Sequence, residues 1–386
     1  MAVPARGQDQ GDSQPATVET LPDAIEYWTL PGEGAGPLVV NDGNGTLWTF
    51  FHQTGNLVAL SAADGSALLD VPMSISPTAL AFTPDWSLGF LAGEPLDDQI
   101  IDVGVVQAID ATSGVVLGEI ELEGSCNAVC AADGGILYAA CGMQYGYEGT
   151  IYRLSWKTAA NGAIAFAVET QATCGKVPWA IALYDNTLYV TDLELQWTAQ
   201  PDGTMGPPYG SWVWEYDPES LELNDRSWVG INPSRLGVTE FGVLAGCSGS
   251  KQSEGEMVEP SLSLIGGPGG TEPIVIGTTG ASDLAVAPDG TWAVVSLSDW
   301  ASAPPWSAAA LLQNLKPGTS SQAMRWVYTG DLAYVAFEDG KPVAQRTQLF
   351  TDSFIRAVAV STDGTRIYAL QSEPERIAVI PVDMIM

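Results

Sequence analysis

The stretch Asp283–Ser296 (DLAVAPDGTWAVVS) decides the fold of this chain, because it encodes two short apolar strands around a turn. Both runs are rich in Val and Ala, and the pair Asp289 and Gly290 between them favours the positive φ angles of a tight hairpin. The same pattern recurs in Thr78–Leu91 (TALAFTPDWSLGFL) and in Arg356–Leu370 (RAVAVSTDGTRIYAL). We therefore expect a series of β-hairpins.

Weaker copies of this hairpin, at Asn127–Tyr138 and Trp179–Val190, extend the pattern along the chain. From Asp42 to Asp185, the turn aspartates recur every 43 to 52 residues. The interval from Asp185 to the next turn aspartate, Asp289, is twice as long, and a degenerate unit, Arg235–Thr279, fills it. A long insertion precedes the last unit. This gives seven units, and a period of about 40 to 50 residues with several short strands per unit is typical of a β-propeller.

The two ends of the sequence complete the expected ring. The last unit has only three candidate strands and ends at Ile377–Val382, while a single strand, Ala24–Leu30, precedes the first hairpin. If that N-terminal strand completes the last blade, no blade edge stays open. The sequence therefore predicts an all-β, seven-bladed β-propeller, as one domain over residues 21–386. Residues 1–20, rich in Gln, Asp, Ser, Pro and Thr, are expected to form a flexible leader.

Four segments stand out within these units: the Pro-Asp-Gly turn at 288–290, the Thr-Asp-Gly turn at 362–364, the turn Asp110–Gly114 (DATSG) and Leu188–Asp192 (LYVTD). In these segments the chain resembles the YVTN-type propellers and their relatives in the quinoprotein and lactonase-like superfamily. In the last of these, Asp192 replaces the Asn of the tetrad that names the group. The resemblance implies the seven-bladed fold. Because its members include lactonases, subunits of periplasmic dehydrogenases and non-catalytic surface proteins, it leaves the function open.

The charge balance excludes several classes of partner. The 386 residues carry 46 Asp and Glu against 14 Lys and Arg, for a formal net charge of −32, and no Lys or Arg lies between Gly7 and Tyr152. Such a chain repels nucleic acid and anionic bilayers. No apolar run reaches the roughly 20 residues of a membrane helix. We therefore expect no nucleic-acid partner and no transmembrane segment.

The low lysine content and the five cysteines favour an extracellular or periplasmic protein. Across a two-residue turn at Asp133 and Gly134, Cys126 faces Cys141, which predicts a disulfide in an oxidising compartment. The first residues lack the long apolar stretch of a signal peptide. That start fits a mature secreted form or an intracellular protein, and in the latter all five cysteines would be free thiols.

Four connections are longer than a turn requires, and in a propeller of this connectivity they lie on one face. They are Gly93–Val103, Leu193–Gly210, Cys247–Pro260 and Asp299–Gln322. Carboxylates around a central opening can hold a hard cation such as calcium. The candidate metal ligands are Asp97, Asp98, Glu148 and Asp192. A solvated acidic rim explains the same residues, because no loop shows a spaced calcium motif.

Aromatic residues gather in or beside the same connections. Flat aromatic faces flanked by carboxylates suit a glycan or a protein partner, and packing between blades is the alternative. The candidate ligand-binding residues are Trp197, Tyr209, Trp212, Trp214, Trp300 and Trp306. The tryptophans within strands, Trp48, Trp179 and Trp292, are instead expected to pack between blades.

The single histidine, His52, excludes multi-histidine copper, iron and zinc sites. His52 is a candidate general base, and Asp192 is the other candidate catalytic residue. A surface or packing role also accounts for His52. The sequence favours a secreted, non-catalytic binding or scaffold protein that acts through its long loops. Two alternatives stay open. One is a metal-assisted hydrolase or isomerase of a small ester or lactone, with a cation at the channel mouth; the other is an accessory subunit of a periplasmic redox complex.

Overall fold

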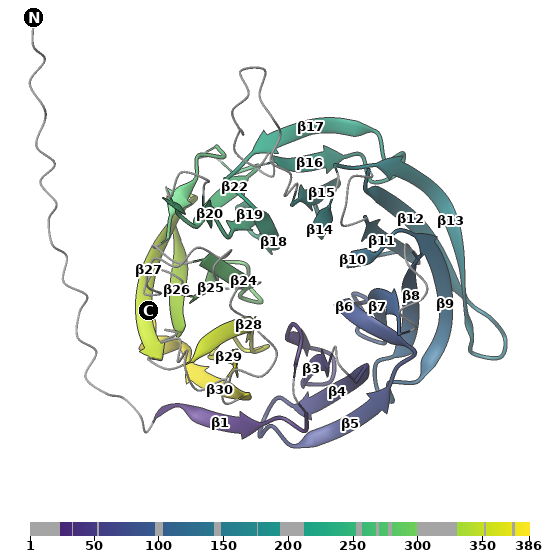
Figure 1. Ribbon diagram of the computed structural model, residues 1–386, viewed down its shortest axis with the longest axis horizontal. Coiled ribbons are helices and arrows are strands. Elements are labelled where there is room, and N and C mark those ends of the chain that lie inside the picture. The colour runs from purple at the N-terminus through teal and green to yellow at the C-terminus, as the bar shows by residue number, and fades with distance from the viewer. Residues whose placement is uncertain are drawn as a thin grey trace, which may run out of the picture.

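The chain forms seven four-stranded antiparallel sheets around a central opening, within the part that the computed structural model describes (Figure 1). The described residues are 24–32, 34–51, 54–96, 103–142, 148–175, 177–193, 212–251, 257–267, 270–276, 280–298, 330–350, 353–372 and 375–386. The predicted all-β, seven-bladed propeller is confirmed. The predicted leader, residues 1–20, lies outside these ranges. Among the described residues, no helix has the length and apolar character needed to cross a membrane.

Blades 1 to 3 take their strands in chain order from the centre of the ring outward. Blade 1 consists of β2 (Val39–Asn41), β3 (Thr46–Phe51), β4 (Asn56–Ser61) and β5 (Ala67–Pro72). Blade 2 consists of β6 (Ile75–Phe82), β7 (Leu88–Pro95), β8 (Val103–Asp110) and β9 (Val116–Glu123). Blade 3 consists of β10 (Cys126–Ala132), β11 (Ile136–Cys141), β12 (Thr150–Thr158) and β13 (Ile164–Thr173).

Blades 4 to 6 follow the same order. Blade 4 consists of β14 (Pro178–Tyr184), β15 (Thr187–Asp192), β16 (Trp212–Tyr216) and β17 (Leu223–Trp228). Blade 5, the predicted degenerate unit, consists of β18 (Pro233–Thr239), β19 (Gly242–Cys247), β22 (Ser261–Ile265) and β23 (Ile274–Val275), with the small hairpin β20 (Ser250–Lys251) and β21 (Met257–Val258) inserted. Blade 6 consists of β24 (Gly280–Val286), β25 (Trp292–Ser298), β26 (Gly330–Glu338) and β27 (Lys341–Phe350).

Blade 7 is built from both ends of the chain. It consists of β28 (Phe354–Val360), β29 (Arg366–Ser372), β30 (Arg376–Pro381) and, as its outer strand, β1 (Glu26–Thr29). The carboxylate of Glu375 accepts hydrogen bonds from the N–H groups of Gly34 and Ala35, at 2.7 and 2.5 Å, and so holds the segment that leaves β1. A short 3-10 helix, Val382–Met384, ends the chain. The predicted closure of the ring by the N-terminal strand is confirmed.

The hydrophobic core lies in the seams between neighbouring blades. Trp48 of blade 1 is 1% exposed and contacts Phe82 of blade 2, with the ring centroids 5.7 Å apart. Trp292 packs beside the cluster between blades 6 and 7. The expected packing role of the strand tryptophans is thus confirmed for these two. It is wrong for Trp179, which is 37% exposed because it sits at a bulge of the innermost strand and faces the central opening.

The hairpin turns follow two designs. Asp185 and Asn186 form the expected two-residue turn, with φ angles of 44° and 58°. The turn at Asp289 is longer. There the Asp289 carboxylate accepts hydrogen bonds from the N–H and the hydroxyl of Thr291, and Gly290 has a φ of 72°. At such turns the aspartate serves as a hydrogen-bond acceptor, and the glycine alone takes the left-handed conformation.

The predicted disulfide between Cys126 and Cys141 is present. The register that was expected to create it is only partly right. The hairpin turn spans three residues, so that Ala132 pairs with Ile136, and a bulge at Asn127 then restores the pairing of Cys126 with Cys141. The innermost strands of blades 2 to 7 all carry such a bulge near their start.

Polar side chains at these bulges join one blade to the next. Asp283 of blade 6 accepts hydrogen bonds from Nε of Arg235 in blade 5, at 2.6 Å, and from the N–H of Val358 in blade 7, at 3.0 Å. In the same way Asn127 of blade 3 donates to the carbonyl of Pro178 in blade 4, at 3.0 Å. These bonds tie the ring together around its central opening.

Candidate functional site

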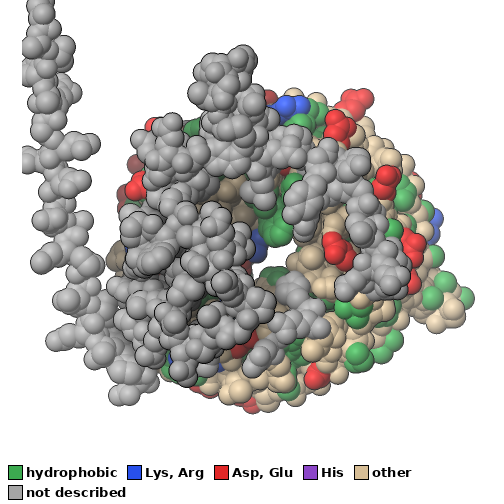
Figure 2. Space-filling view, viewed as in Figure 1, with side chains coloured by type: hydrophobic (Ala, Val, Ile, Leu, Met, Phe, Trp, Pro, Cys, Tyr) green, Lys and Arg blue, Asp and Glu red, His purple; other side chains and the backbone are tan. Residues whose placement is uncertain are grey.

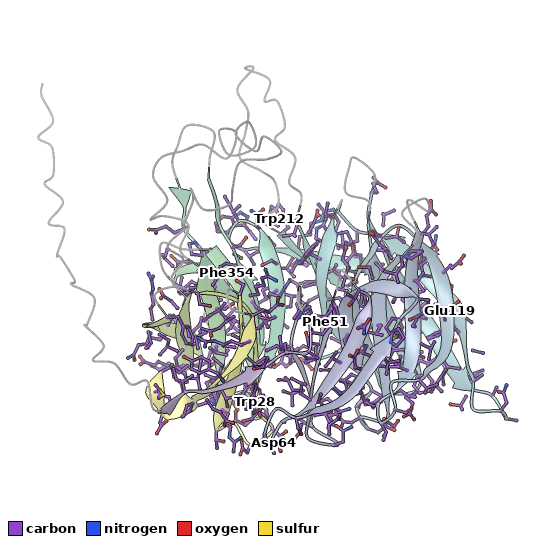
Figure 3. The ribbon with its side chains drawn as sticks, turned by 60° about the horizontal axis from the view of Figure 1, so that its bottom comes forward. Trp28, Phe51, Asp64, Glu119, Trp212 and Phe354 are labelled. Atoms are coloured by element: carbon purple, nitrogen blue, oxygen red, sulfur yellow. A yellow bond between two sulfur atoms is a disulfide. The ribbon has the colours of Figure 1, made fainter. Side chains whose placement is uncertain are left out.

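The four long connections predicted from the sequence each join the second strand of a blade to its third. Since neighbouring strands are antiparallel, these strand ends lie on one rim of the ring, which we call the loop rim. β15 ends there at Asp192, and β16 begins there at Trp212. Figure 3 shows Trp212 on this rim and Asp64 on the opposite one, which we call the turn rim.

Four of the predicted site residues fall within the described ranges, namely Glu148, Asp192, Trp212 and Trp214. The other seven, about which the structure says nothing, are His52, Asp97, Asp98, Trp197, Tyr209, Trp300 and Trp306. The four described residues were assigned to two different purposes, a metal site and a ligand surface. The structure brings Glu148, Asp192 and Trp214 together in the seam between blades 3 and 4, with Trp212 two residues from Trp214 on the same strand.

A cavity of about 520 Å³ opens in this seam, and we call it the blade 3–4 cleft. One wall is the outer strand of blade 3 and the other is formed by β16 and β17 of blade 4. The lining residues are Glu148, Ala172, Thr173, Gly175, Asp192, Trp214, Tyr216, Leu221, Leu223 and Arg226. Its volume is within the range of about 300 to 1,000 Å³ that is common for ligand sites.

The blade 4 wall of the cleft carries its aromatic side chains. Residues two apart in a strand point to the same face, so Trp212, Trp214 and Tyr216 all face blade 3. Trp212 pairs directly with Trp228 on β17, and Trp214 pairs with Arg226. Cross-strand partners share a face. The exposed fractions are 38% for Trp212 and 51% for Trp228, which form an open aromatic pair nearer the loop rim than the cavity.

Trp214 already holds a cation. The guanidinium carbon of Arg226 lies 3.7 Å from the centroid of the Trp214 ring, a cation–π contact. On the other side along the strand, the ring of Tyr216 lies parallel to that of Trp214, with an interplanar angle of 7° and centroids 6.4 Å apart. Nε1 of Trp214 is buried and has no hydrogen-bond partner among the described residues.

Asp192 closes the inner end of the cleft. Its side chain is buried, and Oδ1 accepts a hydrogen bond from the N–H of Val177, at 2.9 Å. Oδ2 packs so closely on Gly175 that a Cβ atom there would lie 2.0 Å away. Next to it, Tyr216 donates its hydroxyl to the carbonyl of Thr173, at 3.0 Å. These contacts give Asp192 a clear positional role, since it fixes the link between blades 3 and 4.

The predicted metal ligands are partly assembled. Glu148 and Asp192 line the same cleft, whereas Asp97 and Asp98 lie outside the described residues. Within the described ranges, no group of three or more His, Cys, Asp or Glu side chains is placed to hold a metal ion. Beside Asp192, burial and the nearby carboxylate raise the pKa of the Cys174 thiol, so this sulfur stays protonated at neutral pH.

A second cavity, of about 440 Å³, is the central opening itself. Trp179 faces it, together with the ion pair of Arg235 and Asp283. Beyond this ion pair, Asp283 accepts a hydrogen bond from the N–H of Val358, and Arg235 donates one to the carbonyl of Ser234. The central opening therefore contributes one exposed aromatic ring and a polar pair that already serves the packing of blades 5 to 7.

Sequence reasoning missed the outer half of the aromatic wall. No candidate residue was placed on the last strand of this blade, β17, which spans Leu223–Trp228, after a turn in which Leu221 has a φ of 57°. Arg226 and Trp228 were therefore not recognised. The signal that could have found them is the pairing of two tryptophans at the ends of two adjacent strands.

No protein-family model matches this sequence, and no curated protein sequence matches it. Solved structures are similar in fold. A crystal structure of the RRP9 WD40 repeats is 10% identical, with a TM-score of 0.60, over 93% of this chain and 97% of that one. A chain of the mitotic checkpoint complex is 12% identical, with a TM-score of 0.58, over 99% and 98% of the two chains.

A third similar structure is hydrazine synthase from Kuenenia stuttgartiensis. It is 16% identical to this chain, with a TM-score of 0.56, over 81% of this chain and 79% of that one. At such low identities these structures establish the propeller fold and no activity. They support a seven-bladed propeller in general, and they do not single out the YVTN-type group within it.

Proposed function

We propose that this protein is a non-catalytic binding protein that holds its partner at the loop rim and in the blade 3–4 cleft. The observation that carries the proposal is the exposed cross-strand pair of Trp212 and Trp228 beside the cleft. Large aromatic side chains next to a pocket are typical anchors of protein interfaces. A protein partner fits this arrangement, and a glycan is the alternative ligand.

The same proposal places the protein outside the cytoplasm, in the periplasm or the extracellular space. Its support is the disulfide between Cys126 and Cys141, because such bonds persist in oxidising compartments. The formal net charge of −32 and the scarcity of lysine agree with a soluble secreted protein. Descent from the YVTN-type propellers also remains a proposal, and the segment Leu188–Asp192 in β15 supports it.

The experiment compares the wild-type protein with the variant W212A/W228A. Each is immobilised and exposed to purified extracellular proteins and to a glycan array, and each bound species is then titrated as a pure component. We expect a partner whose affinity falls at least tenfold in the double variant, because truncated interface aromatics commonly cost about 2 kcal/mol or more. The matched control is Tyr27→Ala, which removes an exposed aromatic from β1 in blade 7. Equal affinity of all three proteins for every partner would refute the proposal.

A second candidate function is metal-assisted hydrolysis or isomerisation of a small ester or lactone. The observation that favours it is that Glu148 and Asp192 line one cavity, where carboxylate oxygens could bind calcium. The test is a calcium titration followed by calorimetry, with Glu148→Gln as the variant. A stoichiometric calcium ion that is lost in this variant would favour the enzyme. No binding in the millimolar range would exclude a calcium site that depends on Glu148.

A further inference from the structure

We propose that Trp212 and Trp228 bind Arg or Lys side chains of a basic partner segment, as Trp214 binds Arg226 within this chain. The proposal deepens the proposed function and rests on it, since it names the chemistry of the partner. Its basis is that one face of β16 and β17 carries two adjacent cross-strand pairs. One pair is an aromatic ring with its cation, and the other is two aromatic rings.

The geometry of the two pairs is matched. Trp212 stands two residues from Trp214 on β16, and Trp228 stands two residues from Arg226 on β17, so all four side chains share one face. In the described part of the chain, no cation lies over the ring of Trp212 or Trp228. Since both rings are substantially exposed, a cation from another molecule can reach them. Tryptophan offers the strongest cation–π acceptor among the aromatic side chains.

Charge selects a basic occupant over a neutral one. The formal net charge of the chain is −32, and the described surface in Figure 2 shows many more carboxylates than basic side chains. Glu148 and Asp192 add two carboxylates to the cleft, and among its described lining residues Arg226 alone is basic. Such a field steers a positively charged partner toward the cleft and repels an acidic one. A neutral glycan would use the same ring faces without responding to this field.

The test uses a fluorescently labelled (Gly-Arg)₄ peptide and its citrulline counterpart, which has the same shape without the charge. Binding is followed by fluorescence anisotropy at 50, 150 and 500 mM salt. We expect the arginine peptide to bind and the citrulline peptide to bind at least tenfold more weakly. We expect W212A/W228A to weaken binding of the arginine peptide by roughly tenfold, from the loss of two exposed cation–π contacts. Binding should weaken as the salt concentration rises.

A second variant separates the contact from general charge attraction and from misfolding. Arg226→Ala uncovers the ring of Trp214 and removes a positive charge from the cleft, so it should tighten binding of the arginine peptide by a few-fold. A misfolded variant would not gain affinity. The control E219Q/E222Q removes two exposed carboxylates from the turn between β16 and β17, on the turn rim. It should leave the effect of the tryptophan substitutions unchanged.

Three results would overturn the proposal. One is equal binding of the arginine and citrulline peptides, and another is unchanged binding of the arginine peptide to W212A/W228A. The third is tryptophan-dependent binding of a neutral oligosaccharide, such as chitohexaose, in place of the peptide. In this last case the proposed binding function survives and only the ligand class fails. If neither peptide nor oligosaccharide binds and no partner is found at the loop rim, both proposals fail.

Discussion

Among the described residues, two neighbouring seams of this ring differ in how tightly their outer strands pack, and a cleft opens in the looser one. The seam between blades 2 and 3 is closed to its outer edge. Gly118 of β9 lies so close to β13 that a Cβ atom there would be 2.0 Å from the carbonyl oxygen of Ile164. Behind this contact, Phe90 packs against Trp156 and Phe166, with centroids 5.7 and 6.0 Å away.

The seam between blades 3 and 4 has the opposite arrangement. On the side of blade 3 the residues at the cleft are small, such as Ala172 and Gly175, while the large rings of Trp214 and Tyr216 stay on blade 4. Tyr216 is buried against blade 3 and donates its hydroxyl to Thr173, yet about 520 Å³ remains open between the two walls. The two seams also differ in their cysteines. The closed seam contains the disulfide, and the open seam contains the buried free thiol of Cys174.

The comparison teaches that the wedge between two blades is closed by the side chains of the outer strands and not by the fold itself. Blades diverge outward, so outer strands meet only where bulky residues on both sheets interdigitate or where a glycine lets two backbones touch. Seams that satisfy this condition contribute stability. A seam that does not satisfy it leaves aromatic surface available to a partner. Substitutions in the two seams can therefore separate stability, which depends on the closed seam, from binding, which depends on the open seam.

Removal of the disulfide should give the largest loss of stability, because it lies in the closed seam. For the variant C126S/C141S we expect the free energy of unfolding to fall by about 3 kcal/mol, the entropic value for a closed loop of this size. The bond joins residues 15 apart in the sequence. The measurement is urea denaturation with and without reductant. Cys174→Ser is the control from the open seam, and its stability should not depend on reductant beyond the wild-type response. Equal losses in both variants would contradict the distinction between the seams.

Larger side chains at the outer strands should have the next largest effect on stability, and this effect should differ between the two seams. Gly118→Ala places a Cβ atom against the Ile164 carbonyl, so overpacking should lower the free energy of unfolding by about 2 kcal/mol. Ala172→Leu adds a larger group, but it faces the open cleft, so stability should change by less than about 0.5 kcal/mol. Thermal unfolding measures both. If Ala172→Leu were the more harmful substitution, the cleft would not be open.

Substitution of Asp192 tests whether the inner end of the open seam contributes to stability. Asp192→Ala removes the acceptor for the N–H of Val177 and should lower the free energy of unfolding by about 1.5 kcal/mol, as expected for a hydrogen bond to a charged group. Asp192→Asn retains an acceptor oxygen and should lose less. Denaturation curves give these values, and peptide binding is measured in parallel. A stable Asp192→Ala variant that has lost all binding would instead point to direct contact between Asp192 and the ligand.

The sequence was sufficient to predict the ring, because each step depended on local patterns. Alternating strands and turn aspartates such as Asp289 recur at a fixed spacing, and the single strand before the first hairpin completes the three-stranded last unit. Even the disulfide was found, although a three-residue turn and a bulge at Asn127 offset each other to bring Cys126 opposite Cys141. Strong local signals survive small errors of register.

The cleft could not be predicted in the same way, because it depends on which residues of separate blades meet. The strand Leu223–Trp228 (LNDRSW) has a weak β pattern, and its register depends on the positive φ of Leu221 and on a bulge near Glu215. Without that register, Trp228 cannot be paired with Trp212. The meeting of Glu148 with Trp214 likewise depends on two blades, so a metal site and an aromatic surface were predicted where the structure shows one cleft.

The smallest expected effect on stability comes from the aspartates of the turn rim. Substitutions in blades 2 and 4, which flank the two seams, should have similar effects there. Asp110 in blade 2 and Asp217 in blade 4 each accept hydrogen bonds from the N–H and hydroxyl of a serine three residues later, Ser113 and Ser220. Burial alone would raise the pKa of Asp110, but the Ser113 and Thr112 hydrogen bonds outweigh it and lower this pKa. The backbone and side-chain hydrogen bonds of Ser220 lower the pKa of Asp217.

A carboxyl group whose pKa is lowered by folding stabilises the folded state above its unfolded value, near 3.8, and this contribution is lost as the pH falls through the lower folded value. Asp110→Asn and Asp217→Asn should therefore lower the unfolding temperature slightly at pH 7, and the deficit should shrink by pH 3. Melting curves of the wild type and both variants across this range test the expectation. Because the two turns have the same geometry, the two variants should differ less from each other than from the wild type. A markedly larger effect for Asp110→Asn would show that the difference between the seams extends to the turns, and that the outer strands do not account for it alone.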